Sequence, residues 1–249
     1  MSQIDQINFE NKKVLVRVDF NVPLDKKTYE VTDDTRIRAA LPTIKKILKD
    51  GGSMVLMSHL GRPLKKLKDD GSIDVEKFTL HHILSKLSEL LGQEVMFANN
   101  CIGEEVVDQA KSLQAGQVLL VENTRFHKGE EKGDTEFAEE LAKLGEIYIN
   151  DAFGTAHRAH ASTTIVAQSF DQDHKAFGYL MNAEVANAEK VIKSPIKPFT
   201  AILGGAKVSD KILIIENLLD RANYILIGGG MSYTFLKALG HPIGKSLCE

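Results

Sequence analysis

The stretch Phe199-Thr200-Ala201-Ile202-Leu203-Gly204-Gly205-Ala206-Lys207-Val208-Ser209-Asp210-Lys211 indicates the fold class. A short apolar run that ends in two glycines is typical of a buried strand, and the apolar residues after it return at helical spacing. Gly204 and Gly205 are therefore predicted to lie at a strand-to-helix junction, where free backbone N–H groups can hold an anion. Lys207 and Lys211 are four residues apart, so on the opening turn of a helix they would project from one face toward that anion. The stretch suggests a phosphate site, although a tight turn followed by two solvated lysines explains the same residues.

The composition is that of an ordinary globular chain. The sequence has 249 residues, of which 43% are hydrophobic and 26% charged, with a formal net charge of −3. A weakly negative chain gives no reason to expect nucleic acid or an anionic membrane as a partner, so any anion site must be local. Cys101 and Cys248 lie far apart without metal-ligand spacing, which predicts two reduced thiols. The sequence shows no signal peptide and no membrane span, so we expect a cytoplasmic monomer.

Predicted strands and helices alternate along the chain. The period-2 and buried-strand patterns predict strands at 13–19, 53–58, 94–98, 117–121, 146–150, 199–203 and 224–227. Apolar residues at three-and-four spacing predict helices at 33–50, 75–91, 101–115, 136–144, 176–193, 208–219 and 231–239. This alternation predicts an α/β fold: a Rossmann-like parallel sheet with helices on both faces, in two domains.

Three segments are predicted to lie at the surface without a role in a site. The polar segment Leu64–Ser72 is predicted to be a mobile loop. The charge run Lys128–Asp134 is predicted to be a solvated loop, with Asp134 or Thr135 capping the next helix. His81 and His82 leave different faces of one helix, so we expect no metal pair there.

Polar and basic residues recur where the predicted strands end. In a parallel sheet the carboxyl ends of the strands share one edge, and ligands bind beyond that edge. Planar guanidinium groups suit bidentate recognition of phosphate and carboxylate. The sequence therefore predicts a basic pocket for a multiply anionic small molecule, although scattered surface arginines remain the simpler alternative. The residues concerned are Asp19, Asn21, Arg36, His59, Arg62, Arg125, His157 and Arg158.

Two prolines, Pro195 and Pro198, mark a boundary after the helix predicted at 176–193. We accordingly divide the chain into an α/β domain at 1–175, a helix and hinge at 176–195, and the start of a second α/β domain at 196–249. The glycine run at 228–230 follows a buried strand in that second part, where a flat ring or a phosphate could approach the backbone. Two predicted strands do not make a stable parallel sheet, so the second domain is expected to be incomplete.

Six blocks of the sequence, in this order, resemble phosphoglycerate kinase, and together they cover the whole chain. The blocks are Arg17-Val18-Asp19-Phe20-Asn21-Val22-Pro23, Met57-Ser58-His59-Leu60-Gly61-Arg62-Pro63, Glu122-Asn123-Thr124-Arg125-Phe126-His127, Asn150-Asp151-Ala152-Phe153-Gly154-Thr155-Ala156-His157-Arg158-Ala159-His160, Leu203-Gly204-Gly205-Ala206-Lys207-Val208-Ser209-Asp210-Lys211 and Gly228-Gly229-Gly230-Met231.

This resemblance implies a first domain that binds 3-phosphoglycerate or 1,3-bisphosphoglycerate and a second that binds ADP or ATP with Mg²⁺. It places the glycerate phosphate and carboxylate against Asp19, Asn21, Arg36, His59, Arg62, Arg125 and Arg158. It places the nucleotide against Gly204, Gly205, Lys207, Lys211, Gly228, Gly229 and Gly230, with Arg36 and Lys207 as the catalytic residues. The Mg²⁺ ligand of the family lies beyond Glu249, so this chain is expected to be a truncated form, weak for nucleotide and inactive alone.

The reaction of this family needs no protein base. The attacking carboxylate or phosphate oxygen is already ionised near neutral pH, so catalysis reduces to in-line positioning and charge neutralisation, with domain closure to exclude water. Two other functions remain to be compared. A dinucleotide-binding dehydrogenase would need Gly-x-Gly-x-x-Gly after a strand, and no stretch offers it. A 3-phosphoglycerate-binding module without turnover would use the same basic pocket.

Overall fold

The computed structural model describes residues 2–209 and 211–249, so Asp210 in the stretch 199–211 lies outside the described residues. The helices in this part of the chain are α1 (Thr35–Lys49), α2 (Val75–Phe78), α3 (His81–Leu91), α4 (Glu104–Ser112), α5 (Lys128–Lys132), α6 (Thr135–Ala142), α7 (Tyr179–Lys193), α8 (Ile212–Leu219) and α9 (Met231–Ala238). The strands are β1 (Ser2–Gln3), β2 (Lys13–Arg17), β3 (Ser53–Met57), β4 (Met96–Ala98), β5 (Val118–Val121), β6 (Ile147–Asn150), β7 (Lys175–Phe177), β8 (Thr200–Gly204) and β9 (Tyr224–Gly228). The described chain divides into two compact units, Met1–Glu184 and Val185–Glu249.

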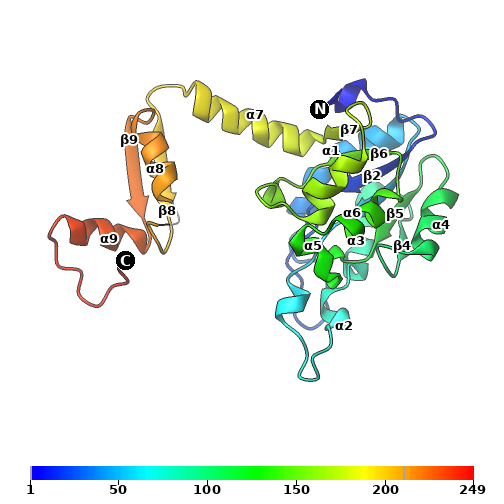
Figure 1. Ribbon diagram of the computed structural model, residues 1–249, viewed down its shortest axis with the longest axis horizontal. Helices are drawn as coiled ribbons and strands as arrows, with labels where there is room; N and C mark the ends of the chain where they lie inside the picture. Colours follow the sequence, from blue (N-terminus) through cyan, green and yellow to red (C-terminus); the bar gives the residue numbers. More distant parts are fainter. Residues whose placement is uncertain (1, 210) are drawn as a thin grey trace. The chain divides into compact units, whose positions relative to one another are not determined.

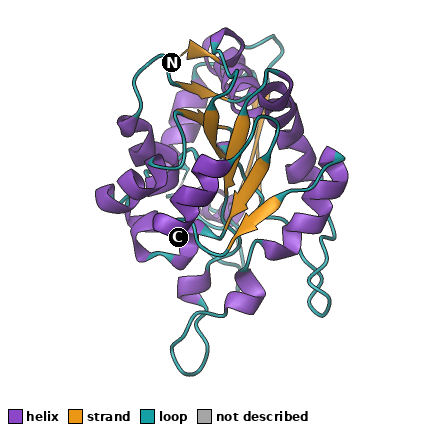
Figure 2. Cartoon of the chain, turned by 90° about the vertical axis from the view of Figure 1, so that its right-hand side faces the viewer, coloured by secondary structure: helices purple, strands orange, loops and turns teal. Residues whose placement is uncertain are grey.

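A parallel sheet organises the first unit. Within the described residues it has seven strands in the order β1-β7-β6-β2-β3-β5-β4. Every pairing in it is parallel, and β2 lies between β3 and β6, with Val16 opposite both Leu56 and Ile149. Helices lie on both sides of these strands (Figures 1 and 2). The predicted α/β class, with a parallel sheet covered on both faces, is therefore confirmed.

The two faces of the sheet form separate apolar cores. On β2, Val14 and Val16 face a cluster that includes α1 and α3, while Leu15 faces the opposite cluster with α4 and α6. This alternation follows from the strand geometry, because successive side chains point to opposite faces. Because both faces are covered, the central strands are apolar at nearly every position, as the sequence of β3 shows. None of the helices in the described chain is both long and apolar enough to cross a lipid bilayer.

The second unit contains a small parallel sheet. Among the described residues β8 and β9 pair only with each other, in register from Thr200 opposite Tyr224 to Gly204 opposite Gly228. Large apolar side chains remain open on it: the exposed fraction is 76% for Ile202 and 54% for Leu226. As expected for two strands, this sheet buries little apolar surface.

The helices predicted at 176–193 and 75–91 differ from the structure. The helix predicted from Ala176 begins at Tyr179, because Lys175–Phe177 form β7 between β1 and β6, with Ala176 in the core. The helix predicted over 75–91 is broken at Thr79, whose backbone is extended. The buried Glu122 causes this break: its carboxylate accepts hydrogen bonds from the Thr79 hydroxyl (2.5 Å) and from the Leu80 amide (2.8 Å).

The charge run after the fifth strand was predicted to be a solvated loop, and this prediction is wrong. Residues Lys128–Lys132 form α5, and the Glu130 side chain is fully buried. Glu130 turns inward because it accepts two hydrogen bonds from Ser162, one from its amide at 2.9 Å and one from its hydroxyl at 2.5 Å. The predicted cap of the next helix is confirmed, since the Asp134 side chain accepts from the Phe137 amide.

Candidate functional site

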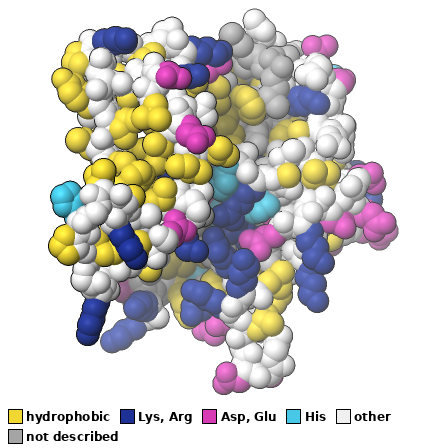
Figure 3. Space-filling view, turned by 60° about the vertical axis from the view of Figure 1, so that its left-hand side comes forward, with side chains coloured by type: hydrophobic (Ala, Val, Ile, Leu, Met, Phe, Trp, Pro, Cys, Tyr) yellow, Lys and Arg dark blue, Asp and Glu magenta, His cyan; other side chains and the backbone are white. Residues whose placement is uncertain are grey.

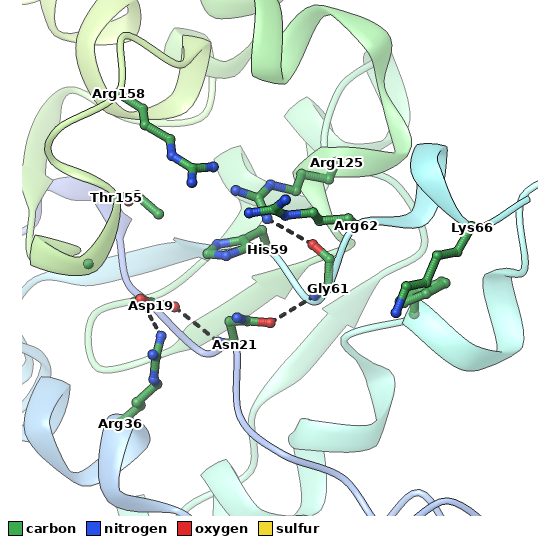
Figure 4. Close-up of a pocket in the computed structure, with 12 residues that line it drawn as sticks. Asp19, Asn21, Arg36, His59, Gly61, Arg62, Lys66, Arg125, Thr155 and Arg158 are labelled. Carbon is green, nitrogen blue, oxygen red and sulfur yellow. Dashed lines mark hydrogen bonds and ion pairs between the residues drawn. The ribbon is translucent and has the colours of Figure 1, made fainter. Parts of the chain in front are cut away.

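A cavity of about 380 Å³ opens at the carboxyl edge of the large sheet, where the segments after β2, β3, β5 and β6 meet (Figure 4). Five of its lining side chains are cationic (Arg36, Arg62, Lys66, Arg125 and Arg158), and one is anionic (Asp19). The other residues of its wall are Asn21, His59, Gly61, Phe78, Gly154 and Thr155. The cavity thus brings together seven of the eight residues predicted for the basic pocket, although they come from four separate parts of the chain. The eighth, His157, is not part of the cavity wall.

Asp19 and Arg36 form the side of the cavity nearest α1. Arg36 Nη1 donates to Asp19 Oδ2 at 2.6 Å, and Asp19 Oδ1 accepts from the Asn21 amide at 3.2 Å. The Arg36 side chain is half exposed, so the pair leaves the rest of its guanidinium open. Gly154 lies against this pair, and a Cβ there would come within 2.6 Å of Asp19 Oδ2. Arg38, two residues on, pairs with Asp34 instead and does not line the cavity.

The backbone of Gly61 joins two other walls of the cavity. Its amide donates to Asn21 Oδ1 at 2.8 Å, and its carbonyl accepts from Arg125 Nη1 at 2.8 Å. Gly61 has φ +61°, and a Cβ there would lie 2.6 Å from the Phe78 ring, so only glycine fits. Arg125 is largely buried, and the loss of hydration lowers its pKa, partly offset by Glu131 with Oε1 at 3.5 Å from Nε.

His59 is a buried wall residue. Only 3% of its surface is exposed, and its Nδ1 lies 3.1 Å from Nη2 of the fully buried Arg17. Burial, together with the positive charges of Arg17 and Arg125, holds the pKa of the His59 imidazole well below its usual value. The ring is therefore neutral at physiological pH and acts as a hydrogen-bond donor or acceptor rather than as a cation.

The remaining cations stand around the mouth of the cavity. Arg158 Nε donates to Nε2 of its neighbour His157 at 3.0 Å, while Arg62 and Lys66 extend from the segment after β3. Figure 4 shows Arg62, Arg125 and Arg158 converging above His59. Lys and Arg side chains also gather beside histidines in the space-filling view (Figure 3). So many cations around one small space would attract and hold a ligand with more than one negative group.

The predicted nucleotide-side glycines lie together in the second unit. Gly204 and Gly228 are paired across the two strands, and Gly229, with φ +69°, approaches Gly205 so closely that a Cβ there would lie 3.0 Å from its carbonyl oxygen. The Met231 amide donates to that same oxygen at 2.8 Å. The two turns therefore form one backbone-lined surface where side chains are absent.

The two lysines of this stretch are not placed as predicted. α8 begins at Ile212 rather than at Val208, so Lys207 lies in the loop before it and Lys211 is its N-cap residue. The Lys211 amide donates to the Val208 carbonyl at 2.8 Å. Lys211 nonetheless lies against the glycines, since a Cβ on Gly205 would come within 3.0 Å of its Cε.

No metal site is formed by these residues. In the ranges that the structure describes, no group of three or more His, Cys, Asp or Glu side chains could hold a metal ion. The side chains around both candidate sites are mainly cationic, which does not fit the oxygen ligands that Mg²⁺ requires.

Sequence reasoning missed several residues of the cavity wall. Lys66 belongs to the segment that was predicted to be a mobile loop, but it follows a short 3₁₀ helix, Pro63–Lys65, and lines the cavity. Gly61, Gly154 and Thr155 lie inside blocks that were noted in the sequence, yet glycine and threonine gave no charge signal. Phe78 is brought in only by the break between α2 and α3, which no local pattern indicates.

The fold and the cavity define a class of protein: a parallel α/β protein with a cationic pocket for a multiply anionic small molecule beyond its strand ends. The family model described as phosphoglycerate kinase matches residues 4–249. The chain belongs to the phosphoglycerate kinase family.

Curated relatives and solved structures agree with this family. The chain is 50% identical to phosphoglycerate kinase from Porphyromonas gingivalis, with 99% of this chain and 62% of the relative covered. It is 53% identical to phosphoglycerate kinase from an Anaeromyxobacter species, over 100% of this chain and 61% of the relative. The solved phosphoglycerate kinase from Coxiella burnetii is 40% identical, with a TM-score of 0.80, and covers 100% of this chain and 59% of its own. The chain thus spans about 60% of the length of the relatives it matches.

Proposed function

We propose that this chain carries the 3-phosphoglycerate half of a phosphoglycerate kinase, which transfers a phosphoryl group reversibly between 1,3-bisphosphoglycerate and ADP. The observation that supports the proposal most strongly is the single cavity lined by all seven residues predicted to hold the glycerate: Asp19, Asn21, Arg36, His59, Arg62, Arg125 and Arg158. The membership of the chain in this family makes the same substrates the first to test.

The geometry suits an anion with two charged ends. The glycerate phosphate needs several guanidinium donors, which Arg62, Arg125 and Arg158 offer together above His59 (Figure 4). The carboxylate end would then lie toward Arg36, which is the more exposed residue of the ion pair between Asp19 and Arg36. In this orientation the reacting carboxylate lies at the half-exposed guanidinium of Arg36, where a phosphoryl group can reach it.

Charge neutralisation and positioning would carry the chemistry. The carboxylate of 3-phosphoglycerate is ionised near pH 7 and attacks phosphorus directly, so no side chain has to remove a proton. Arg36 in the first unit and Lys207 in the second are proposed to neutralise the negative charge on the group in transfer. Gly204, Gly205, Lys211 and Gly228–Gly230 are proposed to line the nucleotide site. Mg²⁺, bound with ADP or ATP, would screen the nucleotide phosphates.

The site of action follows from these substrates. We propose that the chain works as a monomer in the cytoplasm, in glycolysis, because both substrates are small soluble metabolites. Neither nucleic acid nor a membrane is expected as a partner, since the net charge is −3 and the cations are concentrated in one cavity.

Calorimetric titration of the chain with 3-phosphoglycerate, run beside ADP with Mg²⁺, tests the proposal. We expect saturable binding of 3-phosphoglycerate that is lost when Arg125 is replaced by Met. A folded chain that binds no 3-phosphoglycerate would overturn the assignment of the cavity. An assay of ADP formation from ATP and 3-phosphoglycerate then separates the kinase from a binding module without turnover, because the module would bind the glycerate and produce no ADP.

A further inference from the structure

A fully buried arginine stands behind the cavity and is not part of its wall. Arg17 is the last residue of β2, and none of its surface is exposed. Its Nε donates to the Ser162 hydroxyl at 2.7 Å, its Nη1 donates to the Val18 carbonyl, and its Nη2 lies 3.1 Å from His59 Nδ1. Each of the three guanidinium nitrogens thus has a partner within the protein.

The charge of Arg17 is balanced by a buried carboxylate. Glu130 is also fully buried, with Oε1 4.0 Å from Arg17 Nη2. Ser162 lies between the two: its hydroxyl accepts from Arg17 Nε and donates to Glu130 Oε1. Because a buried guanidinium is tolerated only with such a counter-charge and satisfied donors, this arrangement holds Arg17 in one position.

The contact between Arg17 and His59 has only one consistent hydrogen-bond direction. A guanidinium has donors and no acceptor, and it stays protonated in proteins. Nδ1 of His59 must therefore accept, which leaves the proton of the neutral ring on Nε2. Among the described residues Nε2 has no hydrogen-bond partner, and the ring lines the cavity. The Nε2–H group of His59 is therefore available to donate a hydrogen bond to a ligand.

We propose that Arg17 is a positioning residue that fixes His59 as a neutral ring with Nε2–H as its donor toward the cavity. The tautomer follows from the contacts of this chain alone, whereas the ligand that accepts this hydrogen bond rests on the proposed function. His59 then contributes a directed hydrogen bond to a phosphate or carboxylate oxygen, and the arginines contribute the charge.

A bound anion does not reverse this assignment. A negative ligand favours a protonated ring in general, but the second proton would have to bind at Nδ1, directly against an N–H of Arg17. The other groups that act on the ring are Arg125, His160 and Arg36, and each of them lowers its pKa. We therefore expect His59 to keep one protonation state and one tautomer through the range in which other histidines titrate.

Nitrogen-15 spectra of the histidine side chains in the whole, unliganded chain test the tautomer. The His59 signals are identified by their absence from the spectrum of His59→Gln. We expect Nδ1 to give the shift of an unprotonated nitrogen and Nε2 that of a protonated one, unchanged between about pH 5.5 and 8. A proton on Nδ1, or a titration near the ordinary histidine pKa of about 6.5, would overturn the proposal.

Two substitutions of His59 test the role of Nε2 in binding. Gln places an amide donor near the position of Nε2, whereas Asn places its amide near the position of Nδ1. We expect Gln to retain at least about tenfold more affinity for 3-phosphoglycerate than Asn, because only Gln can donate into the cavity. Equal affinity, or an advantage for Asn, contradicts the proposal. If the unmodified chain does not bind 3-phosphoglycerate at all, the proposed function fails while the spectra still decide the tautomer.

Arg17→Gln tests the positioning role itself. In a variant that keeps the amide spectrum of the native fold, we expect His59 to populate both tautomers and to titrate, since the obligatory donor at Nδ1 is gone. A His59 spectrum identical to that of the unmodified chain would show that Arg17 does not set the tautomer. Should this variant not fold, the spectra of the unmodified chain and the Gln and Asn pair decide the question.

Discussion

At the scale of single residues, the cavity is held in shape before any ligand is bound. Asp19 keeps Arg36 in place, and the backbone of Gly61 connects Asn21 with Arg125. Pairing of this kind limits the rearrangement needed on binding, so less conformational entropy is lost when the ligand arrives.

The first prediction concerns the two arginines at the start of α1. Arg36→Ala is expected to weaken 3-phosphoglycerate binding by about 1.5–3 kcal/mol, roughly 10- to 150-fold in Kd, because it removes a charge-assisted contact. Arg38→Ala is the matched control: it lies on the same helix, but its side chain pairs with Asp34. Calorimetry of both variants measures the difference, and an unchanged affinity of Arg36→Ala would remove Arg36 from the site.

The charged residues of the cavity could be predicted from sequence, but their supports could not. Arg62, Arg125 and Arg158 each follow a strand, and the end of a strand is visible in the pattern of apolar residues. Arg17 and Glu130 gave no such signal. Arg17 is the one charged residue at the end of an apolar strand, and Glu130 lies in a run of charged residues that are usually solvated. Their burial depends on each other and on Ser162, which is distant in sequence and near only in the fold.

At the scale of elements, short helices depend on side chains that satisfy their first N–H groups. α6 has only eight residues, and its N-cap is Asp134, whose carboxylate accepts from the Phe137 amide at 2.8 Å. Because Phe137 and Leu141 on this helix are buried in the core, the cap also stabilises the packing on that face of the sheet.

The second prediction follows from this cap. Asp134→Ala is expected to lower the free energy of unfolding by about 1 kcal/mol, the usual loss when an N-cap acid is removed. A smaller change is expected for Asp74→Ala, since Asp74 caps the four-residue, largely exposed α2 through a longer contact of 3.3 Å. Urea denaturation of the two variants provides the comparison. A larger loss in Asp74→Ala would mean that capping is not what stabilises α6.

Element boundaries were the least predictable part of the fold, for a physical reason. The break between α2 and α3 is made by Glu122 from the end of β5, and β7 is made by pairing with β1 and β6. In both cases a distant segment changes the local structure, so periodicity within the segment cannot reveal it. The long amphipathic helix α1 and the apolar strand β3 carry their own signal and were predicted almost to the residue.

At the scale of the whole chain, the two units differ in how much apolar surface they bury. The first unit holds both apolar clusters of the described residues. In the second, the buried apolar side chains of the described residues are few, namely Ala201, Ile215 and Met231. Since the burial of apolar surface is the main source of stability, the second unit should open more readily.

The third prediction is therefore a difference in amide hydrogen exchange. Peptides from β8 and β9 are expected to exchange faster than peptides from β2 and β3, measured by mass spectrometry in the same sample. Addition of 3-phosphoglycerate should slow exchange around residues 57–66 and 150–160 and leave β8 and β9 unchanged, because ligand binding stabilises only the state that binds it. Protection that increased first in β8 and β9 would place the ligand in the second unit.

The fourth prediction concerns acid. The folded state lowers the pKa of His59, His127 and His160, in each case chiefly through burial. Below about pH 6.5 these histidines become protonated in the unfolded chain, while their lowered pKa keeps them neutral in the folded chain. The free energy of unfolding therefore falls as the pH falls. For His59, which is the most buried of the three, the slope is at most about 1.4 kcal/mol per pH unit.

Urea titrations between about pH 7.5 and 5.5 measure this slope. His59→Gln should show a shallower dependence than the unmodified chain, because a glutamine takes up no proton in either state. An identical pH dependence of the two proteins would contradict a neutral, buried His59.

The position of β2 in the sheet has a consequence for folding. β2 pairs with β3 on one side and with β6 on the other, so that Val14 lies opposite Ile147, which is far away in the sequence. A partly folded sheet that lacks β6 can already carry Arg36, His59, Arg62 and Arg125, but it has neither the wall formed by Gly154 and Thr155 nor the guanidinium of Arg158. Contacts between such distant segments form slowly, since a long loop must close first. Under the proposed function, we therefore expect 3-phosphoglycerate to bind only after β6 has joined the sheet, so 3-phosphoglycerate added during refolding can serve as a probe that reports this step.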